Sequence, residues 1–184
     1  MRTLSLFLIA TAGVFAAGDL SNRRAPGFSL PDSRMQQHDV QDYRGRIVLL
    51  EIMQTECPDC VAFAQVLEKT KAKYGDKVAV LSIVTLPDNM TSVNAYLAKH
   101  KITSPVLFDC GQVTASYMKI TPDRPMVRFP HLFVIDTHGQ IRSDYPHNPM
   151  THDVFAGPGL HREIDRLLAE PKARTFEMIL QQQQ

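Results

Sequence analysis

The sequence predicts an α/β fold in which helices cover both faces of a central sheet. Strand and helix patterns alternate from residue 25 to residue 168, which is the order expected of such layered folds. The run at residues 47–52 is apolar except for Glu51, as in a strand that is buried on both faces. With 184 residues, 44% of them hydrophobic, the chain can form one domain with a core and shows no internal repeat. We expect this domain at residues 25–170, before a low-complexity tail at residues 171–184.

The individual elements can be placed from periodicity and from the turn residues between them. A helix is expected directly after residues 57–60, because Phe63, Leu67 and Tyr74 fall at helical spacing and Gly75 is placed to end it. A turn at residues 137–139 separates the two strands of an expected hairpin. The strands are expected at residues 47–52, 77–86, 105–108, 131–136 and 140–145, and the later helices at residues 91–100, 112–118 and 160–168.

The first 18 residues have the pattern of a signal peptide. Arg2 precedes an apolar run, residues 4–15, that is short for a membrane span and is followed by small residues. We therefore expect cleavage near residue 18 and a periplasmic or secreted protein, in whose oxidising compartment disulfides persist. The alternative is an uncleaved membrane anchor at residues 3–17.

The formal net charge of the chain is +1, which shows no overall bias toward nucleic acid or an anionic membrane surface. Function must therefore come from local groups of residues. The three cysteines, Cys57, Cys60 and Cys110, are the first candidates.

Cys57, Pro58, Asp59 and Cys60 stand between an expected strand and an expected helix. There the thiol of Cys57 faces unpaired N–H groups and the positive end of the helix dipole, which favour its thiolate form. Pro58 suits the first helical position, and Cys60 lies close enough to form a disulfide with Cys57. This predicts a redox pair that needs no cofactor or metal. A structural zinc site would need a second ligand pair, and a permanent crosslink over so short a loop would stabilise little.

Five blocks of the sequence carry a resemblance to a known family. They are APGFSLPD (25–32), YRGRIVLLEI (43–52), CPDC (57–60), SPVLFDCGQVTASY (104–117) and FPHLFVIDTHGQI (129–141). In order and spacing they resemble the exported thioredoxin-like proteins of the TlpA/ResA type, within the wider redoxin (AhpC/TSA) group. The resemblance implies a thioredoxin fold with a mixed central sheet. It also implies thiol-disulfide exchange with exported proteins as partners and an upstream thiol as reductant.

The resemblance also implies roles for single residues. Cys57 would attack a substrate disulfide, Cys60 would resolve the mixed disulfide, and Pro130 would be a cis-proline beside the sulfurs. A cis bond at Phe129-Pro130 lets the preceding backbone pair with an extended substrate. The residues expected to contact the substrate are Pro58, Asp59, Phe129 and His131.

Glu51 occupies the strand position at which this family carries a buried acid. Desolvation would raise the pKa of a carboxyl group there toward working pH, so that it could take the proton from Cys60. The alternative is that this strand position points outward and Glu51 is solvated.

Two other classes of function remain open. A peroxiredoxin-like thiol peroxidase resembles the same blocks, but its Pro-x-x-x-Thr-x-x-Cys pocket would need Pro and Thr where this chain has Leu50 and Gln54. A copper chaperone of redoxin fold normally spaces its cysteines by three residues and adds a histidine, so the spacing here argues against it.

Two further features are not assigned by the resemblance. Cys110 leaves an odd thiol in an exported protein, and a buried or capped thiol is expected there rather than a second resolving cysteine or an intermolecular link. The connection at residues 118–129 is longer than usual, so that Arg124, Met126 and Arg128 are available to contact a partner. A solvated surface loop is the alternative.

Overall fold

The computed structural model describes residues 18–170 except Arg124 and Met126. The expected leader up to residue 17, the tail at residues 171–184 and any partner contact of Arg124 and Met126 lie outside these residues. Within the described range, no helix is long and apolar enough to cross a membrane.

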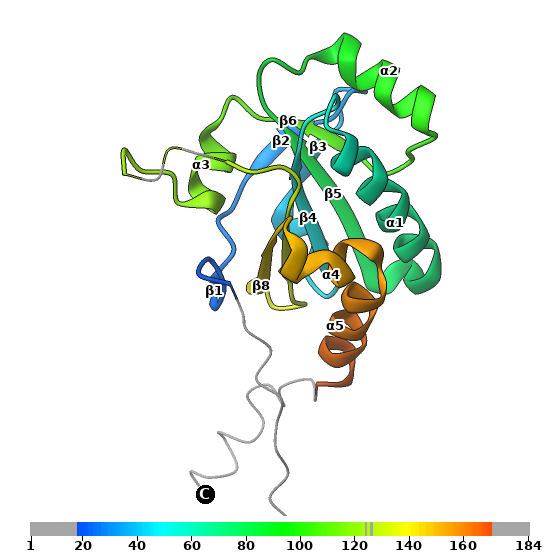
Figure 1. Ribbon diagram of the computed structural model, residues 1–184, viewed down its shortest axis with the longest axis vertical. Helices are drawn as coiled ribbons and strands as arrows, with labels where there is room; N and C mark the ends of the chain where they lie inside the picture. Colours follow the sequence, from blue (N-terminus) through cyan, green and yellow to red (C-terminus); the bar gives the residue numbers. More distant parts are fainter. Residues whose placement is uncertain (1–17, 124, 126, 171–184) are drawn as a thin grey trace, which may run out of the picture.

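A six-stranded mixed sheet forms the centre of the molecule, with the strand order β1-β8-β7-β4-β5-β6 (Figure 1). β4, β5 and β6 run parallel to one another, whereas β7 pairs antiparallel with β4, and β8 pairs antiparallel with both β7 and β1. A separate hairpin pairs β2 with β3. The strands are β1 (Arg23–Arg24), β2 (Ser29–Pro31), β3 (Gln37–Asp39), β4 (Ile47–Met53), β5 (Val78–Val84), β6 (Val106–Phe108), β7 (His131–Ile135) and β8 (Gln140–Pro146).

Helices cover both faces of the sheet, as expected from the sequence. α1, α2, α4 and α5 pack on one face, and α3 with the N-terminal segment packs on the other (Figure 1). The helices are α1 (Pro58–Tyr74), α2 (Met90–His100), α3 (Gln112–Met118), α4 (His152–Ala156) and α5 (Pro158–Ala169), with short 3₁₀ turns η1 (Val40–Tyr43), η2 (Gly75–Lys77) and η3 (Pro149–Thr151).

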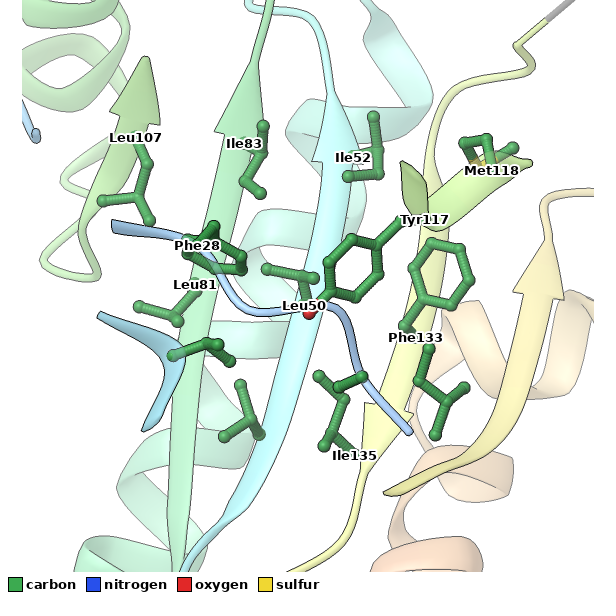
Figure 2. Packing of buried hydrophobic residues seen from close by; sticks show 14 of the residues in the cluster. Phe28, Leu50, Ile52, Leu81, Ile83, Leu107, Tyr117, Met118, Phe133 and Ile135 are labelled. Carbon is green, nitrogen blue, oxygen red and sulfur yellow. The ribbon is translucent and has the colours of Figure 1, made fainter. Parts of the chain in front are cut away.

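The alternation of side chains along β4 divides the core into two layers. Ile47 and Leu49 pack toward α1 and α5, whereas Leu50 and Ile52 pack toward α3, because successive side chains of a strand point to opposite faces. Figure 2 shows the α3 side of the sheet, where the Tyr117 ring lies over the strands, 5.3 Å from the Phe133 ring between centroids. Glu51 therefore belongs to the α1 side.

Asp144 on β8 fastens the N-terminal segment to the α3 side of the sheet. Its buried carboxylate accepts hydrogen bonds from the Leu20 amide at 3.0 Å and from the Ser21 hydroxyl at 2.7 Å. The Arg23 guanidinium donates to the carbonyl oxygens of Leu20 and Tyr117. The segment before the expected domain start at residue 25 is thus part of the packed structure.

The strand expected at residues 77–86 ends earlier, at Val84. Leu86 is 80% exposed and is joined to Pro87 by a cis peptide bond. Since a proline lacks the N–H that a ladder needs, the chain leaves the sheet before this point.

Candidate active site

Cys57 and Cys60 lie at the end of the sheet where β4 passes into α1. Cys57 is the residue before the helix, with extended backbone angles (φ −79°, ψ 117°), and Pro58 is the first helical residue. The Cys57 Sγ accepts a hydrogen bond from the backbone N–H of Cys60 at 3.2 Å. Both thiols are free, Cys57 is partly exposed and Cys60 is fully buried. The pair thus presents one thiol to a partner and keeps the other inside.

Glu51 is buried beneath this pair. Its side chain is fully buried on the α1 face of β4, and Ser82, its neighbour in register on β5, donates a hydrogen bond to Oε2 at 2.9 Å. Oε1 has no hydrogen-bond partner among the described residues. Burial raises the pKa of Glu51 to about 8, although the hydrogen bond from Ser82 opposes the shift. The alternative of a solvated Glu51 is therefore wrong.

The buried thiol of Cys60 resists ionisation. Burial raises its pKa well above the usual range, and the hydrogen bond with Cys57 and the negative charge of Glu51 raise it further. Since only a thiolate attacks a disulfide, Cys60 needs a group that accepts its proton. Glu51 is a carboxyl group of raised pKa close enough to interact electrostatically with that thiol.

Tyr96 is a neighbour of this pair that the sequence analysis did not identify. It packs from α2 into the same buried cluster as Cys60, and its hydroxyl has no hydrogen-bond partner among the described residues. Burial raises the pKa of Tyr96, and the charge of Glu51 adds to the shift. Its apolar context, Val93 and Leu97 on an amphipathic helix, contains no signal for a role beyond packing.

The peptide bond between Phe129 and Pro130 is cis, as expected. The Pro130 carbonyl accepts a hydrogen bond from the amide of His147 at 3.2 Å. The imidazole Nδ1 of His147 lies 3.4 Å from Oδ2 of Asp59, the residue that precedes Cys60 in the motif. His147 thus connects the proline loop with the cysteine motif. No motif in the sequence indicates His147, although the expected hairpin of residues 131–136 with residues 140–145 brings the segment that follows it beside Pro130.

His131 lies on the opposite face of the sheet from Glu51. Its ring is buried, packs 4.7 Å from the Phe133 ring between centroids, and places Nε2 3.4 Å from Oδ2 of Asp144. It is a packed histidine rather than a neighbour of the dithiol. In the described part of the chain, no cluster of three or more His, Cys, Asp or Glu residues could hold a metal ion.

The hydroxyl of Thr55, the nearest threonine to the cysteines, is already bonded. Thr55 donates through its amide to Oδ2 of Asp88 at 3.0 Å and through its hydroxyl to Oδ1 of the same residue. Gln54 stands at the position that a peroxiredoxin threonine would take. The described residues around Cys57 therefore lack the threonine of a peroxide pocket.

Cys110 is exposed, so the expectation of a buried thiol is wrong. It precedes Gly111, the residue before α3, whose φ of 99° turns the chain into the helix. This left-handed turn at Gly111 leaves Cys110 outside the core.

Comparison with known proteins places these features in a family. The model of the AhpC/TSA family matches residues 21–144. The chain is 27% identical over 153 residues to the thioredoxin-like protein YneN of Bacillus subtilis, which covers 82% of this chain and 80% of that protein. It is 24% identical over 118 residues to the thiol-disulfide oxidoreductase ResA of Geobacillus kaustophilus, which covers 64% of each.

Solved structures support the same fold. A protein described as the thiol:disulfide interchange protein DsbE of Chlorobium tepidum superposes with a TM-score of 0.67 at 20% identity, over 81% of this chain and 98% of that one. A protein described as a thioredoxin of Neisseria meningitidis superposes with a TM-score of 0.66 at 24% identity, over 83% and 94%. The chain therefore belongs to the AhpC/TSA family, has a thioredoxin-like fold, and falls among the thiol-disulfide oxidoreductases of that family.

Proposed function

We propose that the protein is an exported thiol-disulfide oxidoreductase that reduces disulfides of other exported proteins through Cys57 and Cys60. The observation that carries the proposal is the asymmetry of the pair, since one thiol is partly exposed at a helix N-terminus and the other is buried beside Glu51. Export is supported by the leader pattern of the first 18 residues.

In the proposed reaction, the Cys57 thiolate attacks one sulfur of the substrate disulfide and releases the other sulfur as a thiolate. The Cys60 thiolate then attacks Cys57 Sγ and releases the second substrate thiolate, which leaves a Cys57–Cys60 disulfide. Glu51 accepts the proton of Cys60 before this second attack. Two electrons pass to the substrate, and an upstream thiol reductant returns two electrons to the protein.

Residues around the pair are proposed to hold the substrate. The backbone of Phe129, before the cis bond to Pro130, would pair with an extended substrate chain. Pro58 and Asp59 are exposed beside Cys57, where they would contact the same chain. His131 is assigned no contact with the sulfurs, because its side chain lies on the other face of the sheet.

The test compares disulfide reductase turnover and peroxide consumption in the same preparations. Wild type should reduce a protein disulfide, and Cys57→Ser and Cys60→Ser should both fall to background because each lacks one of the two sulfurs. Cys110→Ser is the matched control and should keep full turnover. A thiol peroxidase would give the opposite pattern: peroxide removal that survives Cys60→Ser, with no reductase activity in wild type.

A further inference from the structure

A cavity of about 490 Å³ lies beside the cis-proline, on the α3 side of the sheet. Its volume is in the range of sites that bind small molecules or side chains. Apolar walls are contributed by the N-terminal segment, the end of α3 and the end of β8. Polar groups are contributed by the segments on either side of the cis-proline and by β8 (Figure 2 shows Met118). The side chains that matter here are Leu20, Met118 and Pro146 among the apolar ones, and Arg128, His131 and Asp144 among the polar ones.

The cavity borders the segment at which a substrate chain is proposed to pair. His131 directly follows Pro130, and Pro146 faces His131 across the β7–β8 ladder. The next residue, His147, is hydrogen-bonded to Pro130 and lies 3.4 Å from Asp59 of the cysteine motif. His147 therefore connects the rim of the cavity with the cysteine motif, although neither Cys57 nor Cys60 lines the cavity.

The inner wall of the cavity carries a buried imidazole without a hydrogen bond. His131 is 3% exposed, and neither ring nitrogen completes a hydrogen bond with the described residues. Asp144, 3.4 Å from its Nε2, already accepts from Leu20 and Ser21. Since buried polar groups nearly always have partners, the imidazole is suited to a polar group that enters the cavity.

Arg128 is the arginine on the lining. Arg128 is exposed, and it makes no ion pair with the described residues. Two carboxylates also line the cavity: Asp19 has an interaction of its own, and Asp144 accepts the hydrogen bonds from Leu20 and Ser21 described above. A guanidinium pairs best with a carboxylate, because two of its N–H groups match the two oxygens.

We propose that this cavity binds a carboxylate on the substrate disulfide, and that Arg128 and His131 thereby make the protein selective for acidic disulfides. The carboxylate would pair with Arg128 and hydrogen-bond to His131, while its stem would pack on Leu20 and Met118. The inference rests on the proposed function and names its substrate class. The carboxylate can belong to a small acidic disulfide or to an acidic side chain beside a cysteine of a polypeptide.

The experiment uses two small disulfides that differ in charge, 5,5'-dithiobis(2-nitrobenzoate) and the uncharged 2,2'-dithiodipyridine. The protein is reduced with dithiothreitol, desalted, and used in a Cys110→Ser background because that thiol is exposed. In each reaction the dithiol loses two electrons and two protons and a Cys57–Cys60 disulfide forms. The carboxylate reagent leaves as two thiolates, and the pyridine reagent takes up the protons and leaves as two molecules of 2-thiopyridone. Stopped-flow absorbance then gives the rate constant for each reagent.

Arg128→Gln is expected to slow the reaction with the carboxylate reagent about tenfold, the effect of one lost charge-assisted hydrogen bond. The reaction with the uncharged reagent should keep its rate. Arg44→Gln is the matched control, because Arg44 is an exposed arginine that does not line the cavity, and it should change neither rate. His131→Gln is also expected to lower the preference for the carboxylate reagent. Because His131 is buried, Arg128→Gln, which changes an exposed residue, replaces this variant as the test if it does not fold.

Two results would overturn the inference. One is that Arg128→Gln lowers the rate constants for both reagents by the same factor. The other is that Arg44→Gln lowers the preference for the carboxylate reagent as much as Arg128→Gln does. A pair of peptide disulfides with Glu or Gln beside the cysteine distinguishes the sources. Preference for the Glu peptide that is lost in Arg128→Gln assigns the site to polypeptides, and preference confined to the small reagent assigns it to small acidic disulfides. No reaction of wild type with either reagent would instead contradict the proposed function.

Discussion

For single residues, the proposed proton transfer from Cys60 depends on how little solvent reaches Glu51. Its carboxyl group has one hydrogen-bond donor, Ser82, and one oxygen without a partner among the described residues. Burial favours its neutral form, and the Ser82 hydrogen bond favours its charged form. The balance places its pKa at about 8, near the pH at which a general base is useful.

Ser82→Ala should therefore raise the pKa of Glu51 further, because the substitution removes the group that stabilises the carboxylate. The pH above which Cys60 attacks the mixed disulfide should rise together with the pKa of Glu51. Carbon-13 chemical shifts of the Glu51 carboxyl group across pH measure the first effect, and the pH profile of the single-turnover rate measures the second.

Ser143→Ala is the matched control for this prediction. Ser143 is also a buried serine that donates to a buried glutamate, Glu163, at 2.7 Å, but it lies on β8. The titration of Glu51 should be the same as in wild type. An unchanged Glu51 titration in Ser82→Ala would show that the hydrogen bond does not set its pKa.

The sequence predicted Glu51 and Pro130 but not Tyr96 or His147. The first two stand within the blocks 43–52 and 129–141, and the resemblance of these blocks to the family implied their roles. Tyr96 lies near the dithiol because α2 packs against α1. His147 lies near Asp59 because β8, which it follows, pairs with β7. Such contacts depend on helix placement and strand register, which local periodicity does not specify.

At the scale of elements, the turn that carries Cys57 is fastened to the start of α2. Asp88 accepts from the amide and hydroxyl of Thr55 and also from the Ser92 hydroxyl at 2.8 Å. Asn89, the next residue, caps α2 through its own side chain. The position of the nucleophile is thus tied to a helix distant in sequence.

Asp88→Ala should loosen this turn, since three hydrogen bonds to one carboxylate are lost. We expect a destabilisation of about 2 kcal/mol, typical of losing hydrogen bonds to a charged group, and faster hydrogen exchange at the Thr55 amide. Urea unfolding and exchange monitored by NMR measure the two effects. Asp153→Ala, which removes a pair with Arg162 in which both side chains are more than half exposed, should change stability far less. Equal losses in the two variants would contradict this account.

The longer elements were predictable, and of the shortest strands only β6 was. The sequence indicated β4, α1, α2, α3 and α5 because each is long enough to show a period. β1, with two residues, and the hairpin of β2 with β3 offer no such pattern. They form because neighbouring elements supply partners, as β8 does for β1.

Across the molecule, the two faces of the sheet carry different sites. The α1 face holds Cys60, Glu51 and Tyr96 in one buried region, and the α3 face holds the cavity with His131 and Asp144. The proline loop lies where the two meet. The proposed redox chemistry and the proposed substrate selection can therefore change independently.

The stability of the folded protein should depend on pH through Glu51. Its pKa is 4.5 as a reference and about 8 in the fold, so between these values the folded chain holds a proton that the unfolded chain has released. Folding stability from this group therefore falls as pH rises, by at most about 1.4 kcal/mol per pH unit. Glu51→Gln cannot ionise, so its stability relative to wild type should increase from pH 5 to pH 8 and then level off.

Urea unfolding of the reduced proteins at pH 5, 6.5, 8 and 9.5 measures this difference. A difference that is constant across the four values would show that Glu51 titrates alike in the folded and unfolded chains. The same variant should slow the resolving step, because Cys60 then loses its proton acceptor.

Because Cys110 is exposed, alkylation followed by mass spectrometry can report the redox state of the protein. In the proposed disulfide form only Cys110 remains to be alkylated, so the intact mass should increase by a single adduct even after unfolding. The reduced form should gain three adducts after unfolding, whereas alkylation of the native fold should stop short of the buried Cys60. One mass spectrum of a quenched sample then reports what fraction of the molecules carries electrons and is ready to pass them on.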